Sequence, residues 1–191
     1  PVVAGEGEGT VIRVPDRQRQ QWIESDPLGY ADSLSRLNQE HSRHAVPLIK
    51  LIKAWRAMQL PTRRPKSYVL EVMIFQAVDG GHVTLVERGT GRAVADFFNY
   101  IEEKYRDLMD HGTGVPRILD PQLGTLLTGG WERSHFQTFM RRIREAATQS
   151  RKAMNATDDD EAAGAWTKVF GGLWPTEEEV RAAARAEADP E

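Results

Sequence analysis

Apolar residues recur at helical spacing through most of this chain, and this pattern constrains the fold more than any other feature. After Pro15, successive segments carry apolar residues three, four and seven positions apart, separated by Gly and Pro breaks. A strand is indicated only over residues 10–14, where β-branched residues alternate with others before Pro15. We therefore predict a mostly α fold, a helical bundle with a small N-terminal β remnant.

The spacing also locates the expected helices and their core. The predicted helices begin at Asp32 or Ser33, at about Ser42, at Ser67, before Val94, at Trp131, at Glu161 and at Thr176. The second of these runs to Met58, with Val46, Ile49, Ile52, Trp55 and Met58 on its apolar side. The Gly- and Pro-rich residues 111–130 are predicted to form a long surface loop.

Charge is distributed unevenly along the chain. The net charge is −3, yet the segment from His41 to Leu70 contains seven Lys or Arg residues and no acid. From Thr157 to the end there are ten acids against three bases. A protein that binds long nucleic acid is usually basic overall, so this local patch suits a small polyanion such as a nucleotide.

Composition excludes several classes of protein. There is no cysteine, which removes disulfides, thiolate nucleophiles and Cys-zinc sites. No apolar run approaches the roughly 20 residues of a membrane span, and Pro1 does not open a secretory signal. We expect a cytoplasmic monomer that does not bind a membrane.

Lys50, Lys53 and Ser67 are the residues that suggest phosphate binding. Lys50 and Lys53 are three positions apart, so they lie on neighbouring positions of one helix face, where an anion would relieve their repulsion. Ser67 stands at the start of the next predicted helix, whose free backbone N–H groups attract the same anion. These residues also fit a solvated helix edge with Ser67 as a simple cap.

Several segments carry a family resemblance. The string PLIKLIKAW at Pro47–Trp55 and the string KSYVLE at Lys66–Glu71 resemble the helical-domain signature of the cyclic GMP-AMP synthase and oligoadenylate synthase-like nucleotidyltransferases, which include the bacterial CD-NTases. Other pieces follow in family order, at Trp22–Pro27, Ile118–Pro121 and Ala165–Gly171. The resemblance implies that residues 1–27 end a catalytic-core sheet, that 28–175 form a helical nucleotide-gripping domain, and that 176–191 are a polar acidic tail.

The resemblance also implies roles for single residues. Lys53 would contact the triphosphate of an NTP and Ser67 would hydrogen-bond a phosphate oxygen. Lys50, Lys66 and Tyr68 are further candidates for the same nucleotide. Arg56, Arg63 and Arg64 would extend the basic surface toward a second nucleotide or an activating partner, although a solvated loop is the simpler explanation for Arg63 and Arg64.

The sequence departs from this family in its catalytic residues. Such enzymes hold two Mg²⁺ ions with three acids, two of them in an Asp-X-Asp pair after a Gly-Ser turn. Neither element is present, and Asp158–Asp160, which has the spacing, reads as a helix cap. We therefore predict no catalytic or metal-binding residue in this chain and expect it to be inactive alone, either truncated or completed by another chain.

We therefore hypothesise that the chain is the helical lobe of a nucleotidyltransferase that joins NTPs into cyclic or linear oligonucleotide messengers. The resemblance also implies a role in anti-phage signalling. Its expected partners are NTPs and an activating ligand or regulatory protein. One alternative is a non-catalytic module that binds nucleic acid or a protein through the basic 43–66 face. Another is an RNA-modifying relative that shares the triphosphate grip.

Overall fold

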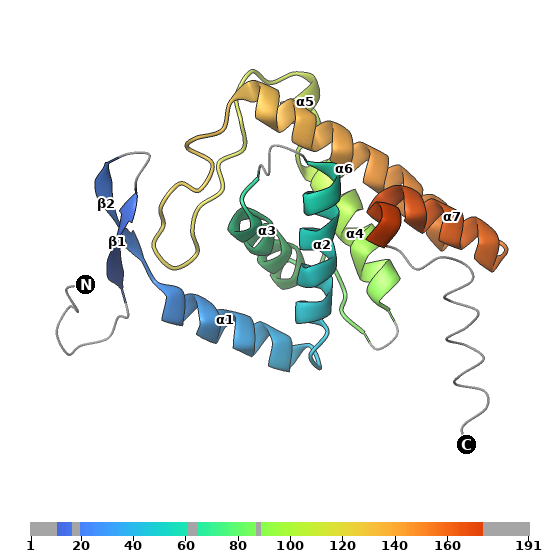
Figure 1. Ribbon diagram of the computed structural model, residues 1–191, viewed down its shortest axis with the longest axis horizontal. Helices are drawn as coiled ribbons and strands as arrows, with labels where there is room; N and C mark the ends of the chain where they lie inside the picture. The colour runs from blue at the N-terminus through green and yellow to red at the C-terminus, as the bar shows by residue number, and fades with distance from the viewer. Residues whose placement is uncertain (1–10, 17–19, 61–64, 87–88, 174–191) are drawn as a thin grey trace.

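The computed structural model describes residues 11–16, 20–60, 65–86 and 89–173, and within these ranges the protein is mostly α-helical (Figure 1). The predicted helical bundle with a small N-terminal β element is confirmed. The elements in chain order are β1 (Ile12–Asp16), β2 (Gln21–Ser25), α1 (Pro27–Glu40), α2 (Ala45–Gln59), α3 (Ser67–Asp79), α4 (Thr90–Lys104), α5 (Arg106–Asp110), α6 (Arg133–Met154), α7 (Asp159–Phe170) and the 3₁₀ turn η1 (Gly171–Leu173).

The β element is an antiparallel hairpin. β1 pairs with β2 so that Ile12 lies opposite Ser25 and Pro15 opposite Trp22. The predicted strand ended too early, at Pro15, and β2 was not predicted. Within the described residues the sheet has these two strands alone, so each has an unpaired edge, and proline is tolerated in an edge strand.

α1 begins earlier than predicted because the Asp26–Pro27 step is a helix start. The Asp26 carboxylate accepts a hydrogen bond from the Gly29 N–H at 2.9 Å, and Pro27 occupies the first turn. A proline there loses no intrahelical bond and its φ already suits the helix. The predicted start at Asp32 or Ser33 is therefore wrong.

α2 begins later than predicted, at Ala45 instead of Ser42. Ser42 and Arg43 have φ values of 51° and 67°, which end α1 in a tight turn and cannot belong to a right-handed helix. The C-terminal half agrees better, because Ile49, Ile52 and Trp55 are buried. Met58, predicted on the apolar side, is exposed.

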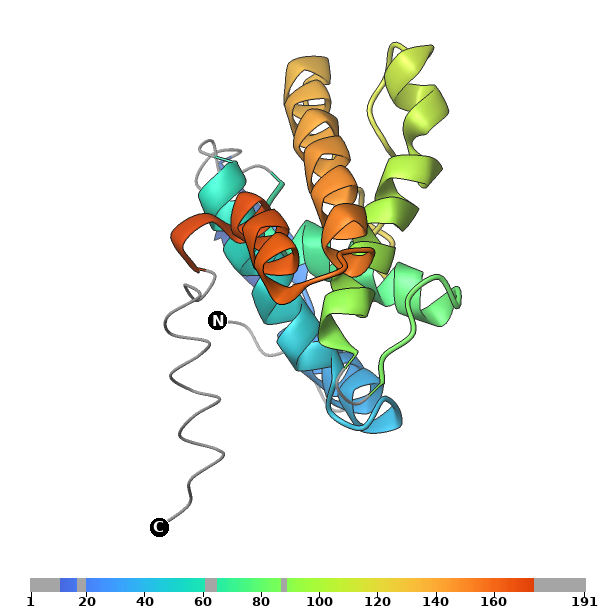
Figure 2. The same cartoon turned by 90° about the vertical axis from the view of Figure 1, so that its right-hand side faces the viewer.

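The core joins α2, α4 and α6 through aromatic side chains. The Trp55 ring of α2 lies 4.9 Å from Phe98 of α4 and 6.4 Å from Phe139 of α6, both at edge-on angles. All three side chains are buried. α4 packs along α6, and α6 packs against α7 (Figure 2). The apolar residues at helical spacing in α4 and α6 thus form part of the core.

Residues 111–130 connect α5 to α6 as the predicted long loop. A single β-bridge between Leu119 and Leu126 closes the tip of the loop. In Figure 1 the tip reaches toward α1 and the hairpin, and Gln122 Nε2 donates a hydrogen bond to Ser33 Oγ of α1 at 2.8 Å. The loop is therefore attached to the helices at both ends and at its tip.

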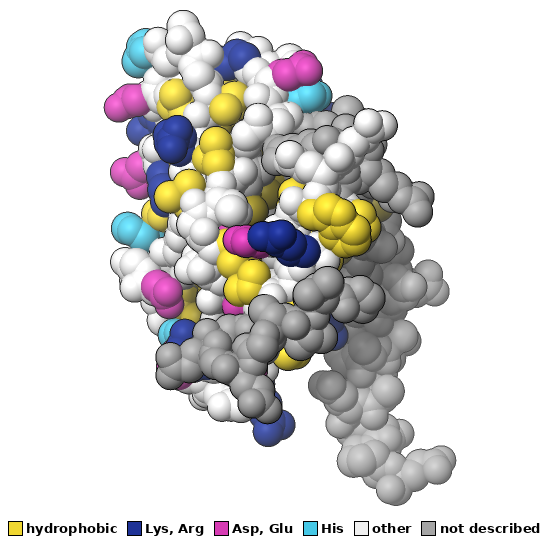
Figure 3. Space-filling view, turned by 90° about the vertical axis from the view of Figure 1, so that its left-hand side faces the viewer, with side chains coloured by type: hydrophobic (Ala, Val, Ile, Leu, Met, Phe, Trp, Pro, Cys, Tyr) yellow, Lys and Arg dark blue, Asp and Glu magenta, His cyan; other side chains and the backbone are white. Residues whose placement is uncertain are grey.

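Hydrophobic side chains are exposed at the hairpin end of the molecule. They lie on β2, at the start of α1 and in the loop: Trp22, Leu28, Leu119 and Leu126. Trp22 has the highest exposed fraction, 66%. Figure 3 views the molecule from this side and shows hydrophobic side chains exposed among charged ones.

Candidate phosphate-binding site

Lys53 of α2 and Glu71 of α3 form an ion pair at the interface of the two helices. Lys53 Nζ lies 2.8 Å from Glu71 Oε1. The Glu71 side chain is 9% exposed, whereas that of Lys53 is 43% exposed. Burial raises the pKa of Glu71. An ammonium group has three hydrogens and this contact uses one, so Lys53 can still donate to an anion in solvent.

Arg56, one turn further along α2, contacts Ser67 directly. Its Nη1 donates to Ser67 Oγ at 3.1 Å, and its Nε donates to the carbonyl oxygen of Pro65. Sequence reasoning assigned Arg56 only to an extended basic surface. The signal that could have placed it was its spacing of three from Lys53, which puts both side chains on the α2 face toward α3.

The first turn of α3 completes this group. Ser67 is the first helical residue, as predicted, and Lys66 precedes it in an extended conformation without a side-chain cap. The first amides of a helix have no intrahelical acceptor, so this turn can donate hydrogen bonds to an anion and presents the positive end of the helix dipole. The Ser67 hydroxyl accepts from Arg56 and keeps its own proton to donate.

The other predicted contacts are less closely grouped. Lys50 and Lys66 are exposed; Lys50 lies one turn before Lys53 on α2, and Lys66 directly precedes α3. Arg63 and Arg64 lie outside the described residues. The structure thus brings Lys53, Arg56 and Ser67 together and places Lys50 and Lys66 at their margin.

Tyr68 is engaged on the other side of α3. Its hydroxyl donates to Asp120 Oδ2 at 3.0 Å, so this oxygen is directed at the loop and not at the surface of Lys53. Burial is the main cause of a raised Tyr68 pKa, with the hydrogen bond and charge of Asp120 adding to it. Asp120 was noted in the sequence only as part of the Ile118–Pro121 resemblance, and its contact with Tyr68 was not predicted.

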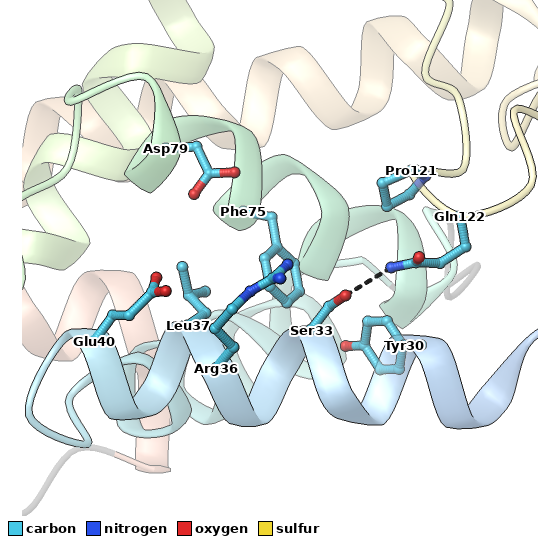
Figure 4. Close-up of a pocket in the computed structure, with 9 residues that line it drawn as sticks. All are labelled: Tyr30, Ser33, Arg36, Leu37, Glu40, Phe75, Asp79, Pro121 and Gln122. Atoms are coloured by element: carbon cyan, nitrogen blue, oxygen red, sulfur yellow. Dashed lines mark hydrogen bonds between the residues drawn. The ribbon is translucent and has the colours of Figure 1, made fainter. Parts of the chain in front are cut away.

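A pocket of about 220 Å³ lies between α1, the end of α3 and the loop (Figure 4). Its lining is Tyr30, Ser33, Arg36, Leu37, Glu40, Phe75, Asp79, Pro121 and Gln122. One arginine faces two carboxylates there, and so the pocket does not favour a polyphosphate. The candidate anion site is therefore the surface formed by α2 and α3.

The described residues contain no cluster of three or more His, Asp or Glu side chains that could hold a metal ion. Asp158 caps α7 by accepting from the Glu161 N–H at 2.7 Å, which confirms the predicted cap. The Mg²⁺ that the resemblance implies therefore has no ligand set in this part of the chain. Among the same residues, no helix combines the length and the apolar character that crossing a membrane requires.

Comparison with known proteins agrees with the resemblance. No protein-family model matches the chain. A cyclic AMP-AMP-AMP synthase of Acinetobacter sp. is 27% identical over 177 residues, which are 92% of this chain and 49% of that relative. A cyclic AMP-AMP-GMP synthase of Enterobacter hormaechei is 27% identical over 180 residues, 90% of this chain and 44% of the relative. The chain thus spans about half the length of the curated relatives it matches.

Solved structures share the fold. E. coli MS115-1 CdnC with ATP superposes with a TM-score of 0.72 at 16% identity, covering 90% of this chain and 58% of CdnC. CdnC in complex with HORMA-deltaN gives a TM-score of 0.66 at 19% identity, covering 82% of this chain and 54% of that one. In sequence the chain is similar to cyclic oligonucleotide synthases, and it shares the fold of CdnC. Both comparisons support a likeness to the bacterial CD-NTases.

Proposed function

We propose that this chain is the triphosphate-gripping helical part of a nucleotidyltransferase that joins NTPs into cyclic or linear oligonucleotide second messengers. The observation that carries the proposal is the grouping of Lys53, Arg56 and Ser67 with the uncapped first turn of α3. The sequence likeness to two cyclic oligonucleotide synthases supports the same reaction class.

The chemistry of this group suits a triphosphate. Lys53 supplies a half-exposed positive charge, and the Ser67 hydroxyl and the α3 amides supply hydrogen-bond donors one turn away. Arg56 adds a positive charge to this surface and holds Ser67 and the chain at Pro65 in place. Held between a cation and a helix N-terminus, the phosphates would be oriented while the rest of the nucleotide stays accessible.

The catalytic parts of the enzyme would lie outside the helical domain. Residues 1–27 would end the catalytic-core sheet, residues 28–175 would form the helical domain, and the acids that hold Mg²⁺ would lie upstream of Pro1. Reading the gene upstream tests this directly. A Gly-Ser turn followed by an Asp-X-Asp pair within about one domain's length is expected, and unrelated sequence there would contradict the proposal.

The partners follow from the same relationship. The CdnC structures contain ATP in one case and HORMA-deltaN in the other, so we propose NTP substrates and a regulatory protein for the complete protein. A role in anti-phage signalling is part of this proposal. An infection assay that compares the wild-type gene with a Lys53→Ala gene tests it.

The grip is tested by nucleotide binding to the complete protein. Lys53→Ala and Ser67→Ala are each expected to weaken the binding of a non-reactive ATP analogue by about tenfold, since hydrogen bonds to charged groups contribute about 1.5–3 kcal/mol. Lys152→Ala is the matched control. Lys152 of α6 is likewise half-exposed and forms an ion pair with Glu161 of α7 at 3.6 Å, away from the α2 and α3 surface. Unchanged affinity in both test variants would favour a non-catalytic module that binds through the basic 43–66 face.

A further inference from the structure

We propose that Asp120 is a positioning residue for the nucleotide site, acting through the Tyr68 side chain. The inference rests on the proposed function, because Tyr68 directly follows Ser67 in the first turn of α3. Asp120 lies in the loop that joins α5 to α6, far from α3 in sequence, and would make the geometry of the grip depend on that loop.

The Asp120 carboxylate is held rigidly on both oxygens. Oδ1 accepts from the backbone N–H groups of Gln122 at 2.8 Å and Leu123 at 3.1 Å, while Oδ2 accepts from the Tyr68 hydroxyl at 3.0 Å. The residue is 8% exposed. Hydrogen bonds to an ionised acceptor are roughly twice as strong as neutral ones, so this contact fixes the far end of the Tyr68 side chain.

The Tyr68 ring is held from a second direction by α1. The Tyr30 ring meets it edge-on with 4.9 Å between centroids, and Tyr30 also meets Phe75 at 6.0 Å. The Gln122–Ser33 hydrogen bond fastens the tip of the loop to α1 beside Tyr30, as Figure 4 shows. Two elements distant in sequence, α1 and the loop, thus determine where one side chain of the α3 first turn lies.

The Asp120 contact acts on the first turn of α3 through Tyr68. The Tyr68 hydroxyl is bonded to Asp120 and is not directed at the phosphate surface, so Tyr68 influences the grip through its backbone, which directly follows Ser67. Without the Asp120 contact this turn would be less ordered, and ordering it again on binding would weaken affinity by about 3- to 10-fold. Asp120 therefore contributes to affinity without touching the nucleotide.

The test uses the complete protein, a non-reactive ATP analogue with Mg²⁺, and a double-mutant cycle of Asp120→Ala and Tyr68→Phe. Each single variant is expected to weaken binding by about 3- to 10-fold, and the double variant no more than the weaker-binding single one. Thr128→Val is the matched control. Thr128 is buried in the same loop, where its hydroxyl accepts from Ile118 N at 3.2 Å and donates to Pro116 O at 2.5 Å. The Thr128→Val substitution should therefore lower Tm without changing the affinity for the analogue.

Asp120→Asn provides a second variant if Asp120→Ala fails to fold, because its oxygen still accepts from Gln122 and Leu123. The Asp120→Asn protein is expected to bind the analogue more weakly than wild type. In a protein that already carries Tyr68→Phe, adding Asp120→Asn should cause no further loss of affinity. Affinity within twofold of wild type in the folded Asp120 variant overturns the inference, and so does an equal loss in Thr128→Val. If Lys53→Ala weakens binding while the Asp120 variant does not, the grip stands and the inference falls. If the wild-type protein does not bind the analogue, both fall.

Discussion

Replacing Glu71 with Gln is expected to tighten nucleotide binding. Glu71 carries the only negative charge found in contact with Lys53 among the described residues, and Gln keeps the shape and the oxygen that accepts from Lys53 Nζ at 2.8 Å. Two unit charges about 4 Å apart interact by about 1 kcal/mol in water, and the exposure of Lys53 makes this screened value the appropriate one. Removing the repulsion between the Glu71 carboxylate and the bound phosphates should therefore raise ATP affinity by about 5-fold.

The affinity gain of Glu71→Gln should depend on pH. Burial raises the pKa of Glu71 above its ordinary 4.5, so the folded protein binds this proton more readily than the unfolded chain. The cost of burying the charge is present above the folded-state pKa and disappears as the pH falls through it. The affinity gain of Glu71→Gln over wild type should accordingly shrink as the pH approaches that range from above, whereas protonation of ATP affects both proteins equally.

Isothermal titration of the complete protein with the non-reactive ATP analogue measures both effects. Glu145→Gln is the control, because Glu145 is exposed and pairs with Arg142 at 2.6 Å on α6. Its affinity should match wild type at every pH. Weaker binding by a folded Glu71→Gln protein would refute the argument, since it would mean that the carboxylate, and not Lys53 alone, supports the nucleotide.

Two further predictions concern the scaffold. Trp55→Ala should lower the free energy of unfolding by about 3–5 kcal/mol, measured by chemical denaturation, because a buried ring between Phe98 and Phe139 is replaced by a cavity. A loss under about 1 kcal/mol would show that this contact does not organise the core. Asp158→Ala should cost about 1 kcal/mol through loss of the α7 cap, and Asp158→Asn should restore most of it. Equal losses in both variants would contradict the capping role.

Periodicity was sufficient to predict the helices whose apolar faces are buried. α4 and α6 follow the expected stripes because Phe97, Phe98, Phe136 and Phe139 meet in one core. The ends were predicted less well where backbone conformation decides them. The left-handed turn at Ser42 and Arg43 stops α1 from merging into α2, and neither residue announces such a φ in the sequence.

The site was partly predictable for a related reason. Lys53 and Ser67 follow from charge, helix spacing and the start of α3, all of which are local. The Lys53–Glu71 pair and the Arg56–Ser67 bond depend on how α2 faces α3, and the Tyr68–Asp120 bond depends on the path of a loop that returns from the far side of α5. Those contacts are set by tertiary packing, which the spacing of residues along the chain does not predict.

The two-stranded hairpin has a practical consequence for handling the isolated chain. A lone hairpin is marginally stable in water, and within the part of the chain that the structure describes, β1 and β2 each present an unpaired edge near the exposed ring of Trp22. Such edges pair readily with edges of other copies. A preparation of these 191 residues should therefore self-associate as its concentration rises, and light scattering of a Trp22→Lys variant should show less of it.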